Sequence, residues 1–237
     1  MIVAQAPVAL LAARNATRTV PIVTFYVGDP VRMGVVESLA RPGGNVTGFT
    51  WDTGFEGIAK SLEAIKEIVP LARRIAILWN LENDSHPFYV KEFDAHARTL
   101  RMAIQSLGVR SVDEFEGAFR QMAEQKSDAV NVFADPLTIR HREALTALLA
   151  RYPIPAMWSS AQWPLAGSVV TMGPNVDDQP RRVAEYMDRI LKGAPAGSLP
   201  FQQPTRQDLI VDAKVARSLG IKLPRSLRLR ADRIVDD

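Results

Sequence analysis

The sequence predicts an α/β fold built on parallel sheets, and two observations predict it. Short apolar runs rich in β-branched residues recur along the chain, and helix-length amphipathic segments separate them. The apolar residues of these runs are largely continuous rather than alternating, as in strands that are covered on both faces. Alternation of such strands with helices is typical of parallel sheets with crossover helices.

The predicted strands are short, and most are followed by a predicted helix. The strands cover residues 22–27, 45–50, 75–79, 129–134, 155–159, 168–172 and 209–211, and a strand-like run also begins at residue 2. The predicted helices cover residues 55–69, 87–98, 138–151 and 179–192. Residues 102–107 fit either a continued helix or a short strand, because Met102 and Ile104 alternate with polar residues.

Composition excludes several classes of protein. The 237 residues are 47% hydrophobic and 23% charged, which suits one or two globular domains. The formal charge of +3 comes from interspersed residues, and the only dense basic stretch, residues 222–233, is interpreted as a solvated C-terminal segment. A nucleic-acid face would need more clustering, so no nucleic-acid partner is expected. The absence of cysteine excludes disulfides and thiolate metal sites.

Polar residues follow the predicted strands where the strands end, and ligands of open parallel sheets bind beyond those carboxyl ends. The candidate ligand-binding residues are Asp29, Asn80, Asp135, Ser159 and Asn175, beside the aromatic residues Tyr26, Trp51 and Trp158. Two carboxylates favour an ammonium group and the aromatic rings favour an apolar body, which predicts a small polar or zwitterionic solute. The alternative is that Asp29, Asp135 and Ser159 are helix N-caps, and the two roles are compatible.

No motif predicts catalysis. Residues 43–48 read Gly-Gly-Asn-Val-Thr-Gly and have the glycine spacing of a phosphate loop, but Phe49 stands where that loop needs lysine. The glycines are therefore predicted to form a tight turn into the next strand. The histidines His86, His96 and His141 show no paired metal spacing. We expect no catalytic residue, metal or cofactor, and a transferase with paired nucleotide-binding lobes stays a minor alternative.

Several sequence blocks resemble one known family. They are Thr19-Val-Pro-Ile-Val, Val27-Gly-Asp-Pro-Val, Arg41-Pro-Gly-Gly-Asn-Val-Thr-Gly, Arg74-Ile-Ala-Ile-Leu-Trp-Asn, Ala134-Asp-Pro, Leu199-Pro-Phe-Gln-Gln-Pro-Thr and Ala216-Arg-Ser-Leu-Gly-Ile. In this order they resemble the ABC-type substrate-binding family that includes tryptophan/tyrosine-uptake lipoproteins. The resemblance covers essentially the whole chain, and the Arg-Pro-Gly-Gly-Asn-Val-Thr-Gly block is its most specific part.

The resemblance implies a periplasmic-binding-protein-like fold with two Rossmann-like lobes. Residues 1–49 with 174–200 would form the first lobe, and 50–173 with 201–237 the second. The family has two further strand–helix units before the position of Ile2, so the first lobe is expected to be incomplete. Residues 102–107 would be a strand, with Arg101 in place of the family's glycine. Gln5-Ala6-Pro7 stands where the family reads Gly-Thr-Pro, so the threonine hydroxyl is missing.

The implied function is that of the solute-binding component of an ABC import system. Its ligand would be a small polar or amino-acid-like molecule, aromatic ones included, bound in the cleft between the lobes and delivered to an ABC permease in the membrane. The sheet edges left by the truncated lobe would invite a homodimer. The alternative is a ligand-sensing or regulatory module, or a truncated homologue that binds nothing, without a transport role.

The resemblance and the N-terminus predict different locations. The family is periplasmic, and we expect the same here by resemblance. The first residues, however, have no positively charged region and no apolar core of signal-peptide length. If this start is genuine, we expect the chain to stay in the cytoplasm.

Overall fold

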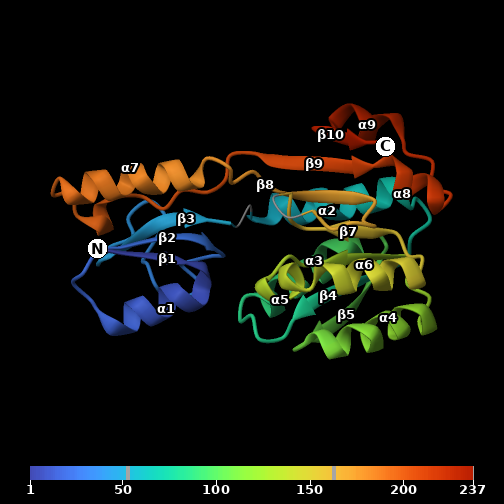
Figure 1. Cartoon of the computed structure of the whole chain (residues 1–237), viewed down its shortest axis with the longest axis horizontal. Coiled ribbons are helices and arrows are strands. Elements are labelled where there is room, and N and C mark those ends of the chain that lie inside the picture. Colours follow the sequence, from blue (N-terminus) through green and yellow to red (C-terminus); the bar gives the residue numbers. More distant parts are fainter. Residues whose placement is uncertain (52–53, 162–163, 237) are drawn as a thin grey trace. The chain divides into compact units, whose positions relative to one another are not determined.

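The chain forms two compact α/β units, which confirms the predicted fold class (Figure 1). The computed structural model describes residues 1–51, 54–161 and 164–236, and residues 54–56 are described by their backbone alone. Unit 1 consists of Met1–Thr53 and Pro174–Arg206, and unit 2 of Gly54–Gly173 and Gln207–Asp237.

Unit 1 is a three-stranded parallel sheet between two helices. Its strands β1 (Ile2–Gln5), β2 (Ile22–Val27) and β3 (Val46–Thr50) lie in that order. Helix α1 (Ala6–Ala16) lies against one face and α7 (Gln179–Leu191) against the other (Figure 1). A sheet covered on both faces buries most side chains of its central strand, which explains why β2 is apolar along most of its length and why only Phe25 and Tyr26 are half-buried in it.

Unit 2 is a seven-stranded sheet in the order β10-β9-β8-β7-β6-β4-β5. All pairs with a described register in this sheet are parallel. Its strands are β4 (Arg74–Asn80), β5 (Ala103–Val109), β6 (Ala129–Val132), β7 (Ala156–Trp158), β8 (Val170–Pro174), β9 (Gln207–Asp212) and β10 (Arg233–Val235).

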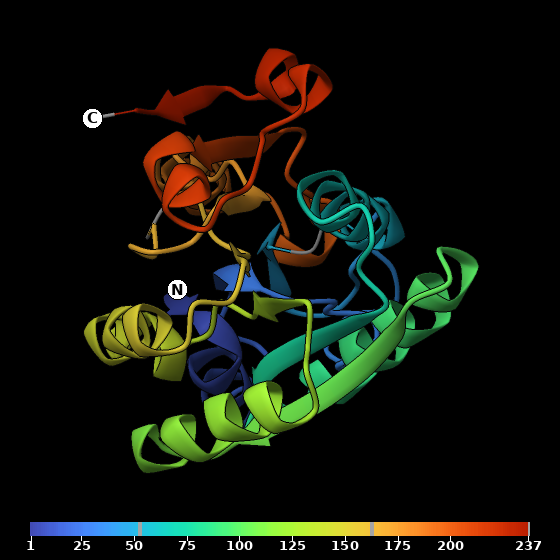
Figure 2. The same ribbon diagram turned by 90° about the vertical axis from the view of Figure 1, so that its right-hand side faces the viewer.

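Helices cover both faces of this second sheet. One core holds side chains from α2 (Gly54–Ile68), α3 (His86–Thr99), α8 (Ala213–Ser218) and α9 (Arg225–Arg230). The other core holds α4 (Phe115–Glu124) and α6 (Arg142–Arg151). Figure 2 shows α9 and β10 as the outermost elements at the β10 edge of the sheet.

The predicted helix over 138–151 is wrong in one detail, because the chain forms two helices there. Helix α5 (Pro136–Arg140) ends at His141, whose φ of −107° and ψ of 31° are not helical, and α6 follows at once. Short 3₁₀ turns, Val112–Glu114 and Ala196–Ser198, complete the elements of the described chain.

The glycine-rich block forms the predicted tight turn. Gly43 and Gly44 have φ of 68° and 56°, values that glycine adopts without steric cost, and β3 starts two residues later. Gly48 within β3 has φ of 153°, and a Cβ atom there would lie 1.9 Å from the carbonyl oxygen of Thr24. This position therefore requires glycine for close strand approach, rather than for binding phosphate.

Two predicted lobe boundaries differ from the structure. The strand end at Thr50 and residues 201–206 were assigned to the second lobe, yet both belong to unit 1. The reason is backbone pairing: Thr50 N donates to Gln202 O at 2.9 Å, and Gln202 N donates to Gly48 O at 3.0 Å. The chain therefore pairs with the edge of β3 at Gln202.

The C-terminal basic stretch is not only a solvated segment. Leu227 of α9 is fully buried in the unit 2 core, and β10 pairs in parallel with β9. Asp232 also bonds twice to Leu209, through its carboxylate at 2.9 Å and its N–H at 2.8 Å. The sequence pattern showed the charges but missed the single buried leucine that anchors them.

The segment after Met102, for which the sequence pattern left helix and strand both possible, is the strand β5, as the resemblance implied. Arg101 precedes it with φ of 57°, in the left-handed region that favours glycine. Met102 N donates to Ala97 O at 2.9 Å, which closes the C-terminus of α3 in the way that a left-handed residue permits. The left-handed backbone conformation at this position thus explains why the family has glycine there.

Replacing Arg101 with glycine should stabilise the protein. The left-handed conformation costs a residue with a Cβ about 1–2 kcal/mol, and the greater freedom of unfolded glycine offsets about half of that. We expect Arg101→Gly to raise the free energy of unfolding by about 0.5–1 kcal/mol in urea denaturation at an unchanged m value. Arg101→Ala keeps the strain and should give no gain; an equal gain in both variants would mean that the arginine side chain is the cause.

Candidate ligand-binding site

A buried polar cluster lies at the carboxyl ends of β4 and β6 in unit 2. Asn80 is the last residue of β4, and its Nδ2 donates to Asp135 Oδ1 at 2.9 Å. Asn83 Nδ2 donates to the other carboxylate oxygen at 3.0 Å. Asp135 is only 4% exposed. The structure therefore brings together two of the residues predicted from strand ends and adds Asn83.

Asp135 is also the N-cap of α5, so the structural alternative is confirmed for this residue. Its Oδ1 accepts from Leu137 N at 2.8 Å, and its own N–H donates to Thr138 Oγ1 at 2.9 Å, which completes a capping box. Three donors thus hold the carboxylate in place. No Lys or Arg of the described residues forms a salt bridge with it.

His86 is a further buried member of this cluster, and the sequence predicts no role for it. It is 5% exposed, and its Nδ1 accepts from Asn80 N at 3.2 Å. The ring lies edge-on to Phe133, with centroids 5.3 Å apart. Burial lowers the pKa of His86 below its ordinary value, while the Asp135 carboxylate opposes that shift. The three-residue spacing Asn80, Asn83, His86 directly after a strand is the signal that could have revealed it.

Ser159 and Trp158 have different surroundings from those predicted. Ser159 Oγ accepts from Ala134 N at 2.7 Å, next to Asp135, and no described helix begins at Ser159. The N-cap alternative is therefore wrong for this residue. Trp158 is fully buried in the core formed with α4 and α6. Its position gives it a packing role, and its contact with a ligand stays a prediction.

In unit 1, Tyr26 and Trp51 form an aromatic pair. Their ring centroids lie 5.4 Å apart in an edge-to-face arrangement, and both residues are half-buried. Tyr26 has φ of 56° at an irregularity in the β2–β3 register, between Thr24 and Val27. Bulges of this kind re-aim side chains, and strained residues cluster at functional sites. The pair is thus the most distinctive feature among the predicted residues of unit 1.

Asp29 and Asn175 hold turns in unit 1. Asp29 Oδ1 accepts from Val31 N at 3.0 Å, and its Oδ2 lies 2.8 Å from Arg32 Nε in a salt bridge. The turn that it caps is not a helix, so the N-cap alternative is wrong here in its strict form. Asn175 Oδ1 accepts from Asp177 N at 3.3 Å. Asp29 is already paired with a cation, which makes it a weaker candidate for a ligand ammonium group than Asp135.

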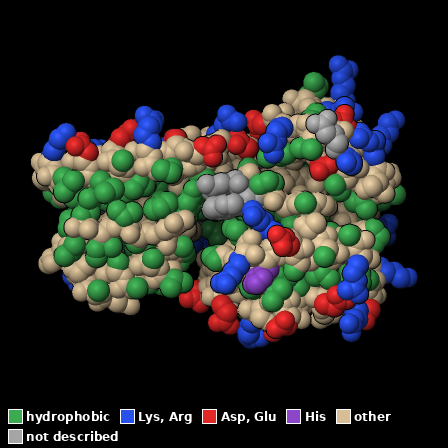
Figure 3. Space-filling model, in the orientation of Figure 1, with side chains coloured by type: hydrophobic (Ala, Val, Ile, Leu, Met, Phe, Trp, Pro, Cys, Tyr) green, Lys and Arg blue, Asp and Glu red, His purple; other side chains and the backbone are tan. Residues whose placement is uncertain are grey.

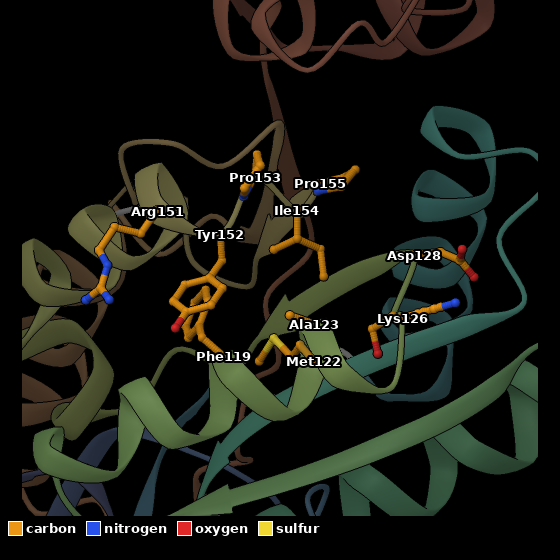
Figure 4. A pocket seen from close by; sticks show the side chains of 11 residues that line it. Phe119, Met122, Ala123, Lys126, Asp128, Arg151, Tyr152, Pro153, Ile154 and Pro155 are labelled. Atoms are coloured by element: carbon orange, nitrogen blue, oxygen red, sulfur yellow. The ribbon is translucent and has the colours of Figure 1, made fainter.

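A surface pocket of about 340 Å³ lies at the amino ends of strands in the unit 2 sheet, opposite the carboxyl ends that hold the polar cluster (Figure 4). It is lined by the ends of α4 and α6 and by the residues that precede β6 and β7, among them Lys126, Asp128, Tyr152 and Pro155. None of the predicted site residues lines it. Because it lies at the amino ends of the strands, it is distinct from the carboxyl-end cluster.

Two further classes of site are not found in the described part of the chain. No group of three or more His, Asp and Glu residues there could hold a metal ion. No helix there is both long and apolar enough to cross a membrane.

Solved structures share the fold of this chain. A conserved domain protein from Vibrio cholerae O1 biovar El Tor N16961 superposes with a TM-score of 0.90 at 25% identity, over 98% of this chain and 77% of that one. The ABC domain from Streptococcus pneumoniae in complex with L-Trp gives a TM-score of 0.90 at 23% identity, over 99% of this chain and 80% of that one.

Residues 1–235 match the family of ABC transporter substrate binding proteins, and the chain belongs to this family. The predicted family assignment is therefore confirmed. The members of this family are substrate-binding proteins rather than enzymes. A curated relative, the tyrosine-binding protein of Clostridioides difficile strain R20291, is 25% identical over 223 residues, or 94% of this chain. The chain spans 62% of that relative's length.

Burial of His86 should make stability depend on pH. The folded pKa lies below 6.5, so the unfolded chain binds more protons as the pH falls through this range. Stability is therefore expected to fall below about pH 6.5, by at most about 1.4 kcal/mol per pH unit for this one group. Urea denaturation at pH 7.5, 6.5 and 5.5 measures it.

The variant His86→Asn removes the titrating group and should flatten this dependence. His96→Asn, outside the cluster, is the control and should keep the wild-type slope. An unchanged slope in the His86 variant would show that another group causes the loss of stability.

Proposed function

We propose that this chain is the solute-binding component of an ABC import system and that its ligand is an aromatic amino acid or a close analogue. Family membership supports the solute-binding role. The names of a tyrosine-binding relative and of an L-Trp complex with the same fold support the ligand class. The observation that carries the proposal is the buried Asp135 carboxylate, which has amide donors but no salt bridge among the described residues.

The polar cluster suits an ammonium group. An ionised carboxylate offers about four acceptor positions, and Asn80, Asn83 and Leu137 N occupy three of them. One position is left for a charged donor, and a charge-assisted bond to a carboxylate of low exposure is stronger than a neutral one. The same donors prevent the carboxylate from rotating, so little entropy is lost when a ligand binds.

The aromatic pair suits the apolar body of such a ligand. Tyr26 and Trp51 present half-buried rings in unit 1, and edge-to-face or offset contacts between aromatic rings contribute about 0.5–1.5 kcal/mol beyond burial of area. Substrate-binding proteins of this family deliver solutes to an ABC permease. We therefore propose the same partner for this chain and a location outside the cytoplasmic membrane.

L-Tryptophan and L-tyrosine should raise the melting temperature of the chain in a concentration-dependent manner, because ligands that bind only the folded state stabilise it. Glycine, L-aspartate and arabinose should not. Asp135→Asn keeps the shape but removes the charge, and isothermal titration should show at least tenfold weaker binding of the responsive amino acid.

The matched control is Asp128→Asn. Asp128 lies just before the amino end of β6, whereas Asp135 lies beyond its carboxyl end. The Asp128 carboxylate accepts from Arg73 N and Arg74 N. Affinity should stay at the wild-type value in this variant. Equal affinity in both variants would exclude Asp135 from the site, and no response to any aromatic amino acid would contradict the proposed ligand class.

We also propose that the β1 edge of unit 1 forms a homodimer. In the described chain β1 pairs only with β2, and large exposed apolar side chains gather around it. These are Met1, Val3, Val8, Leu11 and Val20, of which Val8 is 82% exposed. Figure 3 shows hydrophobic side chains clustered over the region of β1, β2 and α1. An open edge beside an apolar surface favours pairing with a second copy.

Charged residues on this surface should separate the copies. The wild-type chain should have twice the monomer mass in light scattering, and Val8→Glu combined with Leu11→Glu should give a monomer. Leu191→Glu is the control, because Leu191 is 74% exposed but lies on α7. A monomeric wild type at micromolar concentration would contradict the dimer.

A further inference from the structure

A basic surface covers the C-terminal edge of unit 2. Between residues 213 and 236 the sequence has seven Lys and Arg residues and two Asp residues, whereas the whole chain carries +3. The seven, here called the basic surface, lie on α8, α9, β10 and the adjoining loop: Lys214, Arg217, Lys222, Arg225, Arg228, Arg230 and Arg233. All seven are exposed. Figure 3 shows Lys and Arg side chains gathered over this part of unit 2.

Helix α9 presents its arginines outward because its one apolar anchor points inward. Leu227 is fully buried, and residues two before and two after it lie on the opposite side of a helix with 3.6 residues per turn. These residues are Arg225 and Leu229. Leu229 is 74% exposed and lies between Arg228 and Arg230 in the sequence. An exposed apolar side chain therefore stands next to cationic ones.

Only part of this charge is neutralised by the chain itself. Arg230 pairs with Glu67, and Arg217 pairs with Asp236. The hydrogen bond and charge of Arg217, and more weakly the charge of Arg228, lower the pKa of Asp236. In the described residues Arg225, Arg233 and Lys222 form no salt bridge. Net positive charge thus remains for an external partner.

The surface is held on a fixed support. Strand β10 continues the sheet beside β9, with Arg233 opposite Ile210, and Asp232 bonds both ways to Leu209. The arginines of α9 and β10 are therefore presented together, rather than on a loose tail. A fixed set of cations loses less conformational entropy on binding than the same charges on a disordered segment.

We propose that the basic surface docks on the headgroups of an anionic phospholipid bilayer, with Leu229 entering the interface. A guanidinium group can donate two parallel hydrogen bonds to two oxygens of one phosphate. Each Lys or Arg of a cluster adds to the attraction toward an anionic membrane. A bilayer surface needs no matching pocket to bind exposed cations. A single-stranded nucleic acid would need aromatic side chains for stacking, and residues 213–236 contain none. This docking is independent of the ligand proposed above.

The test is cosedimentation of the full chain with vesicles. Vesicles of phosphatidylglycerol and phosphatidylcholine in a 3:7 ratio should bind the chain at 50 mM salt, and pure phosphatidylcholine vesicles should not. Binding should weaken at least tenfold at 300 mM salt, because salt screens the attraction. Absence of binding to the anionic vesicles at 50 mM salt would overturn the proposal.

Two variants separate this surface from general positive charge. Arg225→Glu, Arg228→Glu and Arg233→Glu together should weaken vesicle binding at least tenfold. Arg18→Glu, Arg41→Glu and Arg120→Glu change the net charge equally at exposed positions elsewhere and should reduce it less than threefold. Equal losses in both sets would overturn the proposal. Melting curves verify that each variant is folded.

Leu229→Ser tests the apolar contribution. It should weaken binding severalfold without changing the salt dependence, because it removes buried area and no charge. An unchanged affinity would overturn the insertion of Leu229. Duplex DNA added as a competitor tests the other anionic partner. If a low concentration of DNA abolished vesicle binding because the chain bound DNA instead, the surface would be a nucleic-acid surface and the lipid proposal would be overturned.

Discussion

Burial of parallel strands on both faces is the constraint on which the rest of this structure depends. A strand covered by helices on each side has no solvated face, so its side chains are apolar along most of its length. In β4, for example, Ile75, Ile77 and Trp79 pack on one core while Ala76 and Leu78 pack on the other. Most exposed polar groups of these strands therefore lie at the strand ends. Asn80 and Asp135 meet there because β4 and β6 are neighbours in the sheet and run in the same direction.

The Asp135 cluster shows how one residue combines a structural and a proposed functional role. As the cap of α5 it satisfies backbone donors that the helix start would otherwise leave unpaired. The same bonds, with those of Asn80 and Asn83, fix its carboxylate in a largely buried position without a cationic partner among the described residues. Asp29 has the opposite arrangement, since Arg32 already neutralises it. Sequence position alone made these two carboxylates equivalent, and their surroundings distinguish them.

The two proposed docking surfaces have different physical origins. Around β1, an edge strand of its sheet in the described chain, apolar side chains of β1, of α1 and of the segment before β2 are exposed. Near the β10 edge of unit 2, α9 packs on the sheet through its buried Leu227, and its arginines are exposed. The first surface favours a second copy of the chain, and the second favours an anionic partner. Each follows from what the nearest helix buries, rather than from the proposed ligand.

The sequence by itself determined the fold class, most strand positions, the turn at Gly43 and Gly44 and the family, because these depend on local pattern and on short motifs. It also placed Asn80 and Asp135 at strand ends. Only the tertiary structure decided which strand ends are neighbours, and therefore that Asn83 and His86, which follow β4 after Asn80, lie beside Asp135. Burial was likewise undecidable from pattern: Trp158 is enclosed in a core, and Leu227 anchors a segment that its charges made look solvated. Contacts between residues distant in sequence determine these properties, and no local pattern contains them.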